Sequence, residues 1–260
     1  YSAHWDGTRW YGRGGGLNGY VYAIAVGGAN VYVGGNFTNA GGNPYADYIV
    51  RWEDNYSNAL GAIPLNDTVR AIAVAGWSVY VGGEFTDAGG VTAADYIARW
   101  DGANWHALGS DVNNMVLAIA ATGWDIYIGG NFTNAGGDAT ADYVARYGST
   151  ESNWIAFGST TLNSIVKAIA VAGPDVYVSG LFTDVGGDTA ADFIVRWDGT
   201  SWHALGSPSV NAAVTSIAVV GSDIYVGGAF TSAGGEDNAD HIARWGMAAR
   251  RVYLPLALKN

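Results

Sequence analysis

The chain has 260 residues, 12 lysines and arginines, and a formal net charge of −11. An acidic chain with so few basic residues lacks the clustered positive charge that nucleic-acid phosphates require, which excludes that class of partner. It has no cysteine, which excludes disulfides and thiolate metal sites, and no apolar stretch long enough to predict a membrane span.

Two linked sequence blocks recur five times along the chain. The first reads VYVGGNFTNAGG (31–42), VYVGGEFTDAGG (79–90), IYIGGNFTNAGG (126–137), VYVSGLFTDVGG (176–187) and IYVGGAFTSAGG (224–235). The second is Asp-aromatic-[IV]-[AV]-Arg or a close variant, ending at Arg51, Arg99, Arg146, Arg196 and Arg244. Self-similarity with a period near 50 residues predicts a repeat fold.

Each repeat unit reads as four short strands. In the second unit, alternating or apolar runs cover residues 69–75, 78–85, 94–100 and 104–108, and Gly-containing turns or loops separate them. Four antiparallel strands within about 40–50 residues have the dimensions of a propeller blade. The sequence therefore predicts an all-β, five-bladed β-propeller with four-stranded blades.

The first strand of every unit carries small residues, as in AIA (71–73) and AIA (118–120). The innermost strands of a propeller converge on its axis, where small side chains fit. A linear solenoid, the alternative, needs no such narrowing and would need distinctive capping repeats, which are missing. The pattern therefore favours five blades closed into a ring.

The two ends of the repeat region predict how the ring closes. WDGTRW (5–10) matches WDGANW (100–105), so a fourth strand begins near Arg9, whereas the fifth unit stops after its third strand at HIARWG (241–246). We expect the N-terminal strand to complete the last blade and cover its exposed edge. Residues 1–246 then form the propeller, and residues 247–260 form a short C-terminal tail.

At these motifs the chain resembles secreted bacterial β-propellers with GGxFTxAGG and ARWDGxxWxALG repeats. It is similar to delta-60-type and kelch-like repeats and to the propellers of fungal cortical polarity markers. The resemblance covers about residues 5–246 and implies an extracellular or cell-surface, non-catalytic protein, secreted with its signal peptide removed. The start at Tyr1 rather than Met fits a processed form or a trimmed chain.

The candidate chemical groups recur with the repeat and predict structural roles. Each unit has an Asp four residues before its Arg, as in Asp95 and Arg99, which places both side chains on one face of a strand. Fivefold repetition favours bonds within or between blades over acid–base chemistry. We predict no catalytic residue, no metal and no cofactor, and therefore no enzyme. Asp-rich loops such as 136–142 lack EF-hand spacing, so calcium is a minor alternative.

Departures from the repeat predict binding sites. Trp77 and Trp124 occupy the turn between first and second strands in adjacent units, where an aromatic could stack on a sugar or dock a protein, or simply cover the blade end. Four Asn-x-Ser/Thr sequons are glycosylation candidates, at Asn36, Asn55, Asn66 and Asn131. A glycan-binding lectin or adhesin is therefore the alternative function.

The tail predicts self-association. It carries an apolar β-prone run with candidate assembly residues Val252, Tyr253, Leu254, Leu256 and Leu258. Such a strand packs either on its own propeller or on a neighbour by strand addition. We predict an extracellular structural or assembly propeller, a surface or filament subunit whose partner is itself, a homopolymer joined through terminal segments. An extracellular glycan or protein is the alternative partner.

Overall fold

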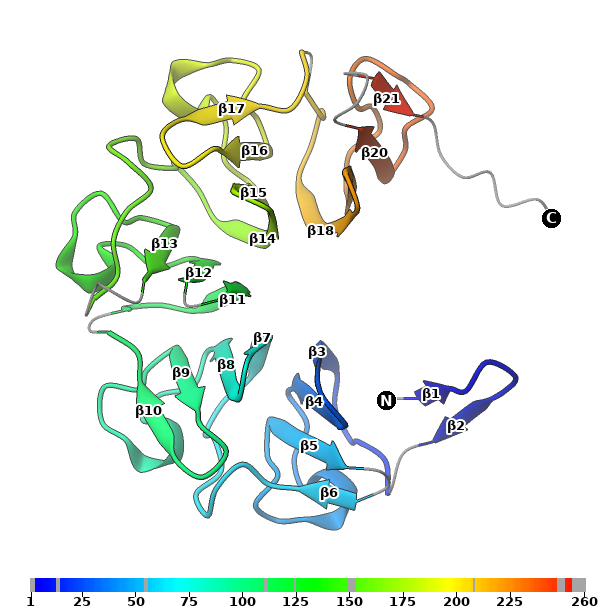
Figure 1. The fold of residues 1–260 in the computed structure, drawn as a ribbon, viewed down its shortest axis with the longest axis vertical. Coiled ribbons are helices and arrows are strands. Elements are labelled where there is room, and N and C mark those ends of the chain that lie inside the picture. The colour runs from blue at the N-terminus through cyan, green and yellow to red at the C-terminus, as the bar shows by residue number, and fades with distance from the viewer. Residues whose placement is uncertain are drawn as a thin grey trace.

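The computed structural model describes residues 3–12, 15–53, 56–109, 112–123, 125–148, 153–207, 209–246 and 251–253. These residues form six antiparallel sheets. Five of them follow one another around a central axis, and the two-stranded one lies beside the opening of this arc (Figure 1). Every sheet is built from strands that are consecutive in sequence, as expected for a repeat of local hairpins. The all-β, propeller-like fold predicted from the sequence is therefore confirmed.

A two-stranded N-terminal hairpin precedes five sheets that we number 1 to 5. The hairpin comprises β1 (Ala3–Trp5) and β2 (Trp10–Gly12). Sheet 1 comprises β3 (Val21–Gly27), β4 (Asn30–Gly35), β5 (Ile49–Glu53) and β6 (Tyr56–Asn58). Sheet 2 comprises β7 (Val69–Ala75), β8 (Ser78–Gly83), β9 (Ile97–Trp100) and β10 (Trp105–Ala107).

Sheet 3 has three strands in the described part of the chain, whereas the other numbered sheets have four. It comprises β11 (Val116–Thr122), β12 (Asp125–Gly130) and β13 (Val144–Tyr147). Sheet 4 comprises β14 (Val166–Ala172), β15 (Asp175–Gly180), β16 (Ile194–Trp197) and β17 (Trp202–Ala204). Sheet 5 comprises β18 (Val214–Val220), β19 (Asp223–Gly228), β20 (Ile242–Gly246) and β21 (Arg251–Tyr253).

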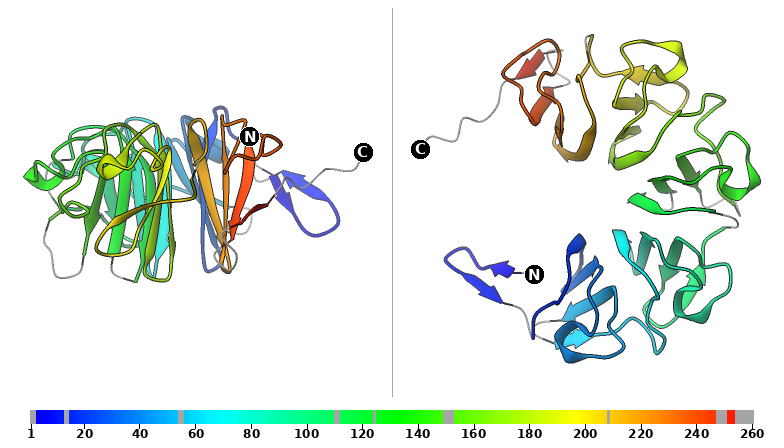
Figure 2. Two further views of the ribbon diagram at one scale, coloured as in Figure 1. Left: turned by 90° about the horizontal axis from the view of Figure 1, so that it is seen from above. Right: turned by 180° about the vertical axis from the view of Figure 1, so that it is seen from behind.

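The first strand of each numbered sheet lies nearest the axis and the last lies outermost (Figure 1). Inner strands of consecutive sheets contact each other, β3 with β7, β7 with β11, β11 with β14 and β14 with β18. No comparable contact joins β18 to β3 among the described residues, and the ribbon is open between sheets 5 and 1 (Figure 2). The sheets therefore form an open arc.

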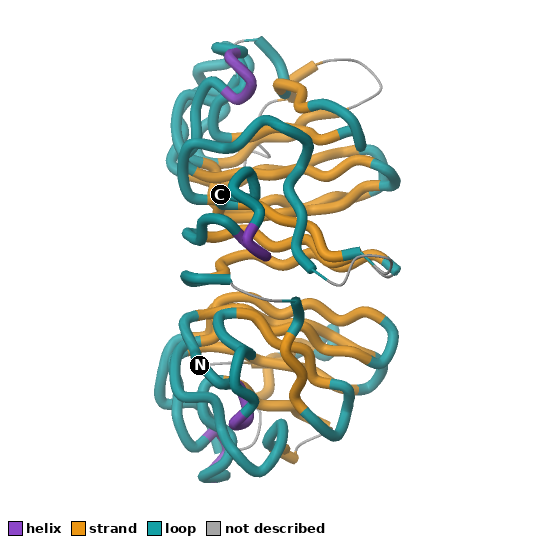
Figure 3. The backbone as a smooth tube through the Cα atoms, turned by 90° about the vertical axis from the view of Figure 1, so that its left-hand side faces the viewer, coloured by secondary structure: helices purple, strands orange, loops and turns teal. Residues whose placement is uncertain are grey.

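The GGxFTxAGG block builds the turn after the second strand. Its Phe and first Ala are fully buried in each of the first three sheets, and a 3₁₀ turn covers AGG or its counterpart at η1 (Ala40–Gly42), η2 (Ala88–Gly90), η3 (Ala135–Gly137) and η4 (Val185–Gly187). The second Gly of the GG pair is required by close approach, because a Cβ on Gly35 would lie 1.9 Å from the Tyr20 carbonyl oxygen. The 3₁₀ turns lie along one side of the molecule (Figure 3).

An asparagine fixes the linker that enters each sheet. Asn66 donates its amide hydrogen to Thr86 Oγ1 at 3.0 Å and accepts from the Thr86 backbone N–H at 2.9 Å. The same pairing of linker Asn with turn Thr recurs at Asn18, Asn113, Asn163 and Asn211. We call it the Asn latch. It uses both ends of the side-chain amide, so it fixes the linker in one orientation.

The predicted closure of the last sheet is wrong in this structure. Trp10–Gly12 pairs with Ala3–Trp5, and the outer edge of β20 is occupied by Arg251–Tyr253. The physical reason is loop length: a strand five residues away pairs through a tight turn, whereas the predicted partner lies more than 200 residues away and closing that loop costs more entropy. The predicted five-bladed closed ring is likewise not observed, because the described residues form six sheets and the arc that they make is open.

Candidate functional site

The interface between consecutive sheets repeats one arrangement. We call the side of a sheet that faces the next sheet along the chain its forward face, and the other side its rear face. A Tyr from the second strand and an Ile or Val from the third strand project from the forward face into the core of the next sheet. These pairs are Tyr32 and Ile49, Tyr80 and Ile97, Tyr127 and Val144, and Tyr177 and Ile194.

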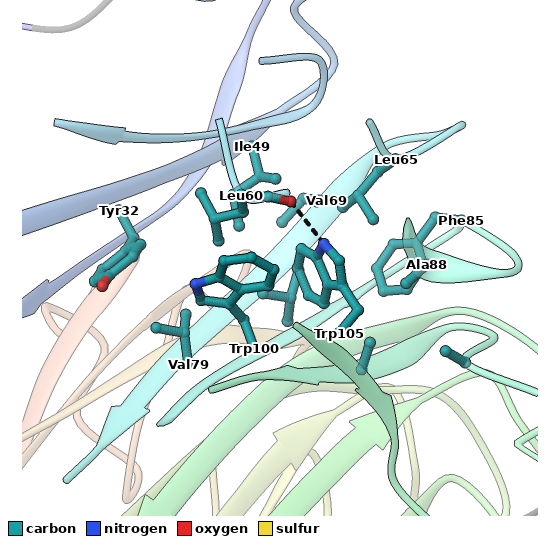
Figure 4. Close-up of a cluster of buried hydrophobic side chains, with 13 residues drawn as sticks. Tyr32, Ile49, Leu60, Leu65, Val69, Val79, Phe85, Ala88, Trp100 and Trp105 are labelled. Atoms are coloured by element: carbon teal, nitrogen blue, oxygen red, sulfur yellow. Dashed lines mark hydrogen bonds between the residues drawn. The ribbon is translucent and has the colours of Figure 1, made fainter. Parts of the chain in front are cut away.

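Sheet 2 illustrates how such a core is built. Tyr32 and Ile49 from sheet 1 lie against Val79 and Trp100 of sheet 2 (Figure 4). The indole N–H of Trp105 donates to the Leu60 carbonyl oxygen of the linker at 2.7 Å, so its one polar atom is satisfied inside the core. The cores of sheets 2 to 5 therefore each belong to two sheets.

A glycine on the forward face makes room for the next sheet. A Cβ on Gly34 would lie 2.3 Å from Val69 Cγ1, and one on Gly82 would lie 2.6 Å from Val116 Cγ1. Real side chains do not approach so closely, so in sheets 1 and 2 the neighbouring sheet, rather than backbone conformation, dictates the first Gly of the GG pair. Sheet 4 has the buried Ser179 at this place. Gly227 occupies the same place in sheet 5 but meets no atom of another sheet.

The forward face of sheet 5 is unmatched. Ile242 is 50% exposed, whereas its counterparts Ile49, Ile97, Val144 and Ile194 are 2–4% exposed. Tyr225 is only partly buried, and Ser216 and Ala218 of the inner strand are exposed. Sheet 5 thus presents the Tyr, the Ile and the glycine of an interface that has no neighbour among the described residues.

The rear face of sheet 1 is the complementary surface, and it is exposed along its inner strand. Its core residues Val33, Val50 and Trp52 are themselves buried, although no Tyr and Ile pair from another sheet packs on them among the described residues. Ile24 and Val26 on the inner strand are 60% and 67% exposed, whereas their counterparts in sheet 2, Ile72 and Val74, are partly buried. Large exposed apolar side chains gathered on one strand mark an interaction surface.

The structure places the predicted binding residues apart from these faces. Trp77 lies in the turn between β7 and β8 and is 95% exposed, and Trp124 lies outside the described residues. Val252 and Tyr253 belong to β21, which pairs with β20 of the same chain, so this part of the tail extends sheet 5. Leu254, Leu256 and Leu258 also lie outside the described residues.

The glycosylation candidates have different surroundings. Asn66 forms an Asn latch, and a glycan on its nitrogen would remove one of the latch hydrogens. Asn36 is exposed, and its Oδ1 accepts from the Tyr20 backbone N–H at 2.6 Å. Asn131 is partly buried, and Asn55 lies outside the described residues. Glycosylation at these sites stays a prediction.

The repeated Asp and Arg side chains do not pair in the predicted way. Asp95 accepts from the Asp87 backbone N–H at 2.7 Å and stabilises the left-handed residue that starts the 3₁₀ turn; Asp47, Asp142 and Asp192 do the same. Arg196 instead pairs with Asp175 on the adjacent strand at 3.0 Å. The loop bends away after the Asp, so four-residue spacing does not keep it on the strand face with its Arg.

A cavity of about 520 Å³ lies where sheets 3 and 4 meet. Its lining includes Tyr127, Phe157 and Trp197, together with Arg146 and Asp125, whose closest side-chain atoms are 3.8 Å apart. Burial raises the pKa of the Tyr127 hydroxyl, so it stays protonated and can donate a hydrogen bond. The exposed lining is mainly polar, with three aromatic rings beside it, and it suits a small polar ligand.

In the described ranges, no three His, Cys, Asp or Glu side chains are grouped so that they could hold a metal ion. Among the same residues, none of the helices has the length and apolar character needed to cross a membrane.

No protein-family model matches the sequence, and no curated protein matches it. Among solved structures, the chain is similar to the WD40 β-propeller domain of Doa1, with a TM-score of 0.55 and 12% identity over 91% of this chain and 68% of that one. It is also similar to the computationally designed Ika8 protein, with a TM-score of 0.53 and 14% identity over 89% of this chain. The chain spans 60% of the length of that designed protein.

The sheet layout and these likenesses define a WD40-like β-propeller fold, and at such identities they concern the fold alone. The finer resemblance to delta-60-type and kelch-like repeats stays a prediction. Sequence reasoning missed the forward-face pair, although its signal was present: the Tyr of the VYVGG-type block and the Ile or Val before Ala-Arg or Val-Arg recur with the repeat. Only the exposure of Tyr225 and Ile242 in the structure identifies sheet 5 as an open end of the arc.

Proposed function

We propose that this chain is a non-catalytic assembly propeller that associates head to tail with a second copy of itself. The forward face of sheet 5 in one copy packs on the rear face of sheet 1 in the next. The contact joins two different surfaces, so it propagates into a filament unless its rotation closes a larger ring. Extracellular placement rests on the resemblance of the repeats to secreted propellers.

The observation that carries the proposal is the exposure of Ile242. A side chain that is 2–4% exposed in four equivalent places is 50% exposed in the fifth. Full burial of one Ile contributes about 1.5–3 kcal/mol, and Tyr225, Ile24 and Val26 would be buried by the same contact. The forward face of sheet 5 also carries the small residues Ser216, Ala218 and Gly227. In the internal interfaces, the glycine at the place of Gly227 leaves the space that the first strand of the next sheet occupies.

The test is the size of the purified chain as a function of concentration, measured by sedimentation velocity. We expect concentration-dependent oligomers, and Ile242→Asp should weaken association at least about 10-fold because it places a carboxylate in an apolar contact. Leu181→Asp is the matched control, since Leu181 is exposed away from both faces and its counterpart in sheet 2 is Glu84. A wild-type chain that stays monomeric at high concentration would overturn the proposal.

The cavity between sheets 3 and 4 supports a second candidate function, glycan binding. Trp197, which is partly buried, offers a stacking surface, and Arg146, Asp125 and Tyr127 offer polar contacts for hydroxyl groups. A glycan array followed by Tyr127→Phe and Trp197→Ala tests it. Binding that both variants weaken supports a lectin; binding that neither changes places the sugar elsewhere.

A further inference from the structure

One row of side chains recurs on the forward face of the sheets. Residues that stand opposite each other on paired strands lie on the same face of a sheet. The forward-face Tyr of the second strand stands opposite an Arg of the third strand, and this Arg stands opposite a residue of the fourth-strand segment. The rows in sheets 1 to 4 are Tyr32, Arg51 and Asn58; Tyr80, Arg99 and His106; Tyr127, Arg146 and Ile155; and Tyr177, Arg196 and His203. The Tyr and the Arg recur, whereas the third residue is not the same in every sheet.

A second cavity, of about 500 Å³, lies where sheets 4 and 5 meet. Its lining includes two members of the row, Arg196 and His203, the following residues 204–207, and Trp245 of sheet 5. The equivalent residues in the cavity between sheets 3 and 4 are Arg146, Ile155, 156–158 and Trp197. The repeat therefore places a cavity at the same position in two successive interfaces.

The two cavities differ in how far they extend inward. The cavity between sheets 3 and 4 reaches Thr122 and Tyr127 on the inner two strands. In the cavity between sheets 4 and 5 the innermost lining residue of sheet 4 is Arg196, and Tyr177 is fully buried. Sheet 4 has the complete fourth strand β17, which the described part of sheet 3 lacks, so the second cavity stays among the outer strands.

The cavities also differ in charge. In the cavity between sheets 3 and 4, Asp125 belongs to the lining and lies 3.8 Å from Arg146. The described lining of the second cavity includes Arg196 and His203 but no carboxylate. The acidic partner of Arg196 is Asp175, which lies 3.0 Å away and outside the lining. A guanidinium has five N–H donors, so this bond leaves others for the carboxylate of a ligand.

Asp198 fixes the imidazole of His203 at the cavity wall. Asp198 Oδ2 lies 2.6 Å from His203 Nε2. Hydrogen bonds from the Thr200 hydroxyl and from the backbone N–H groups of Ser201 and Thr200 hold the pKa of Asp198 well below its usual range. An ionised carboxylate only accepts hydrogen bonds, so Nε2 donates to it. In the neutral ring Nδ1 then carries no hydrogen and accepts one from a ligand hydroxyl.

We propose that the cavity between sheets 4 and 5 binds a sugar acid, with a hexuronic acid as the simplest example. Arg196 binds the carboxylate, His203 accepts from a ring hydroxyl, and the apolar face of the sugar stacks on Trp245. A cavity of about 500 Å³ has the size of a small-molecule site. The inference does not need self-association, and it rests on the glycan-binding candidate for the choice of a sugar.

Two sugars that differ only at C6 test the carboxylate. Methyl β-D-glucuronoside and methyl β-D-glucoside are titrated into the full chain by calorimetry, with sodium acetate as a third ligand. We expect the glucuronoside to bind at least 10-fold more tightly than either of the others. Equal binding of the two sugars would show that the carboxylate is not recognised, and acetate binding as tightly as the glucuronoside would exclude ring contacts. Either result overturns the proposal.

A matched pair of variants locates the site. Arg196→Gln should remove the preference for the glucuronoside, so that the two sugars bind within about 2-fold of each other. Arg146→Gln makes the same change in the cavity between sheets 3 and 4 and should leave the preference unchanged. His203→Ile gives sheet 4 the residue of sheet 3 and should weaken glucuronoside binding at least 5-fold. The reverse pattern, with Arg146→Gln alone removing the preference, would overturn the proposal.

A measurement on the unmodified chain does not depend on the folding of a variant. The protein has four histidines, so their ring resonances can be followed individually by NMR. Addition of the glucuronoside should shift the ring signals of His203 and leave those of His106 in place. His106 makes the same contact with its own Asp101 at 2.6 Å in sheet 2, so it is the internal control. A shift of His106 without one of His203 would place the sugar elsewhere and contradict the proposal.

The outcomes separate this site from the proposed functions. Ile242→Asp should weaken self-association and leave glucuronoside binding unchanged. If the glucuronoside shows no preference while the glucoside binds in a way that Tyr127→Phe weakens, the glycan candidate stands and the sugar-acid site is wrong. If neither sugar binds, both fall.

Discussion

Sheets 2 and 3 carry the same repeat but differ in their outer strand. In sheet 2, β9 and β10 are joined by an Asp-Gly turn and pair over three residues. In sheet 3 the connection is longer, GSTESN (148–153), and among the described residues the pairing consists of a single bridge between Arg146 and Ile155. Yet Trp154 donates its indole N–H to the Leu108 carbonyl oxygen at 2.8 Å, as Trp105 does to that of Leu60 at 2.7 Å.

This comparison separates two structural roles of the fourth-strand segment, which are anchoring by the indole and pairing by the backbone. The buried indole fixes the segment against the preceding linker whether or not a strand forms, whereas the turn decides how far the backbone pairs. Where pairing is lost, the segment Ile155–Gly158 becomes part of the cavity wall. A shortened strand thus converts part of a packed blade into a surface that a ligand could reach.

The largest expected effect comes from removing the indole anchors. Trp154→Ala should destabilise the protein by about 3–5 kcal/mol, because a fully buried Trp is lost and a cavity is left. Trp105→Ala should cost less, since three paired residues still hold β10. Urea unfolding of both variants measures the difference in the free energy of unfolding. Equal losses of stability would contradict separate roles for the indole and the turn.

A turn exchange tests the second role. Replacing residues 148–153 by Asp-Gly-Ala-Asn gives sheet 3 the turn of sheet 2 and should extend its outer strand. We expect a gain of about 1–2 kcal/mol from the added ladder hydrogen bonds. The same change should reduce any glycan binding at the cavity. Binding that persists at full strength would show that the reduced strand does not create the site.

The Asn latches of the two sheets provide a smaller test. Asn66→Ala and Asn113→Ala should each cost about 0.5–1.5 kcal/mol, since each removes two hydrogen bonds at an exposed site. The two values should agree, because the latch precedes the turn at which the sheets diverge. Expression in a glycosylating host should leave Asn66 unmodified, as read by peptide mass spectrometry, because its amide is engaged.

The smallest effect concerns acid pH. Hydrogen bonds from the Asn104 backbone N–H, His106 and the Ala103 backbone N–H hold the pKa of Asp101 well below its usual range. A lowered carboxyl pKa stabilises the fold above the unfolded value near 3.9, and this contribution is lost as pH falls through the folded value. Melting temperatures of Asp101→Asn and wild type should therefore converge below about pH 4. Sheet 3 has Gly148 at this place and makes no such contribution.

The sequence was sufficient for the repeat and insufficient for its ends. Alternation and the Gly motifs predicted the strands because each hairpin is local, and the recurring Phe37 and Ala40 positions fill the core of their own unit. The closure failed because Trp10 fits a fourth strand equally well in its own hairpin or on β20, and pattern alone cannot choose. The exposed faces could not be predicted from the sequence, because Ile242 and Ile97 are the same residue type in the same motif. They differ only in whether a neighbouring sheet covers them.

The cores of sheets 2 to 5 are each shared by two sheets, and this has a consequence for how the molecule unfolds. A sheet in the middle of the arc is held on two sides, but sheets 1 and 5 are each held on one, so the arc should lose structure from its ends inward. Amide hydrogen exchange should be fastest in β3 and β18 among the inner strands and slowest in β11. A joined copy supplies the missing neighbour, so oligomers should protect β3 and β18 while leaving the exchange of β11 unchanged. Self-association would then stabilise sheets 1 and 5 increasingly as the protein concentration rises, while the stability of the central sheet 3 stays the same.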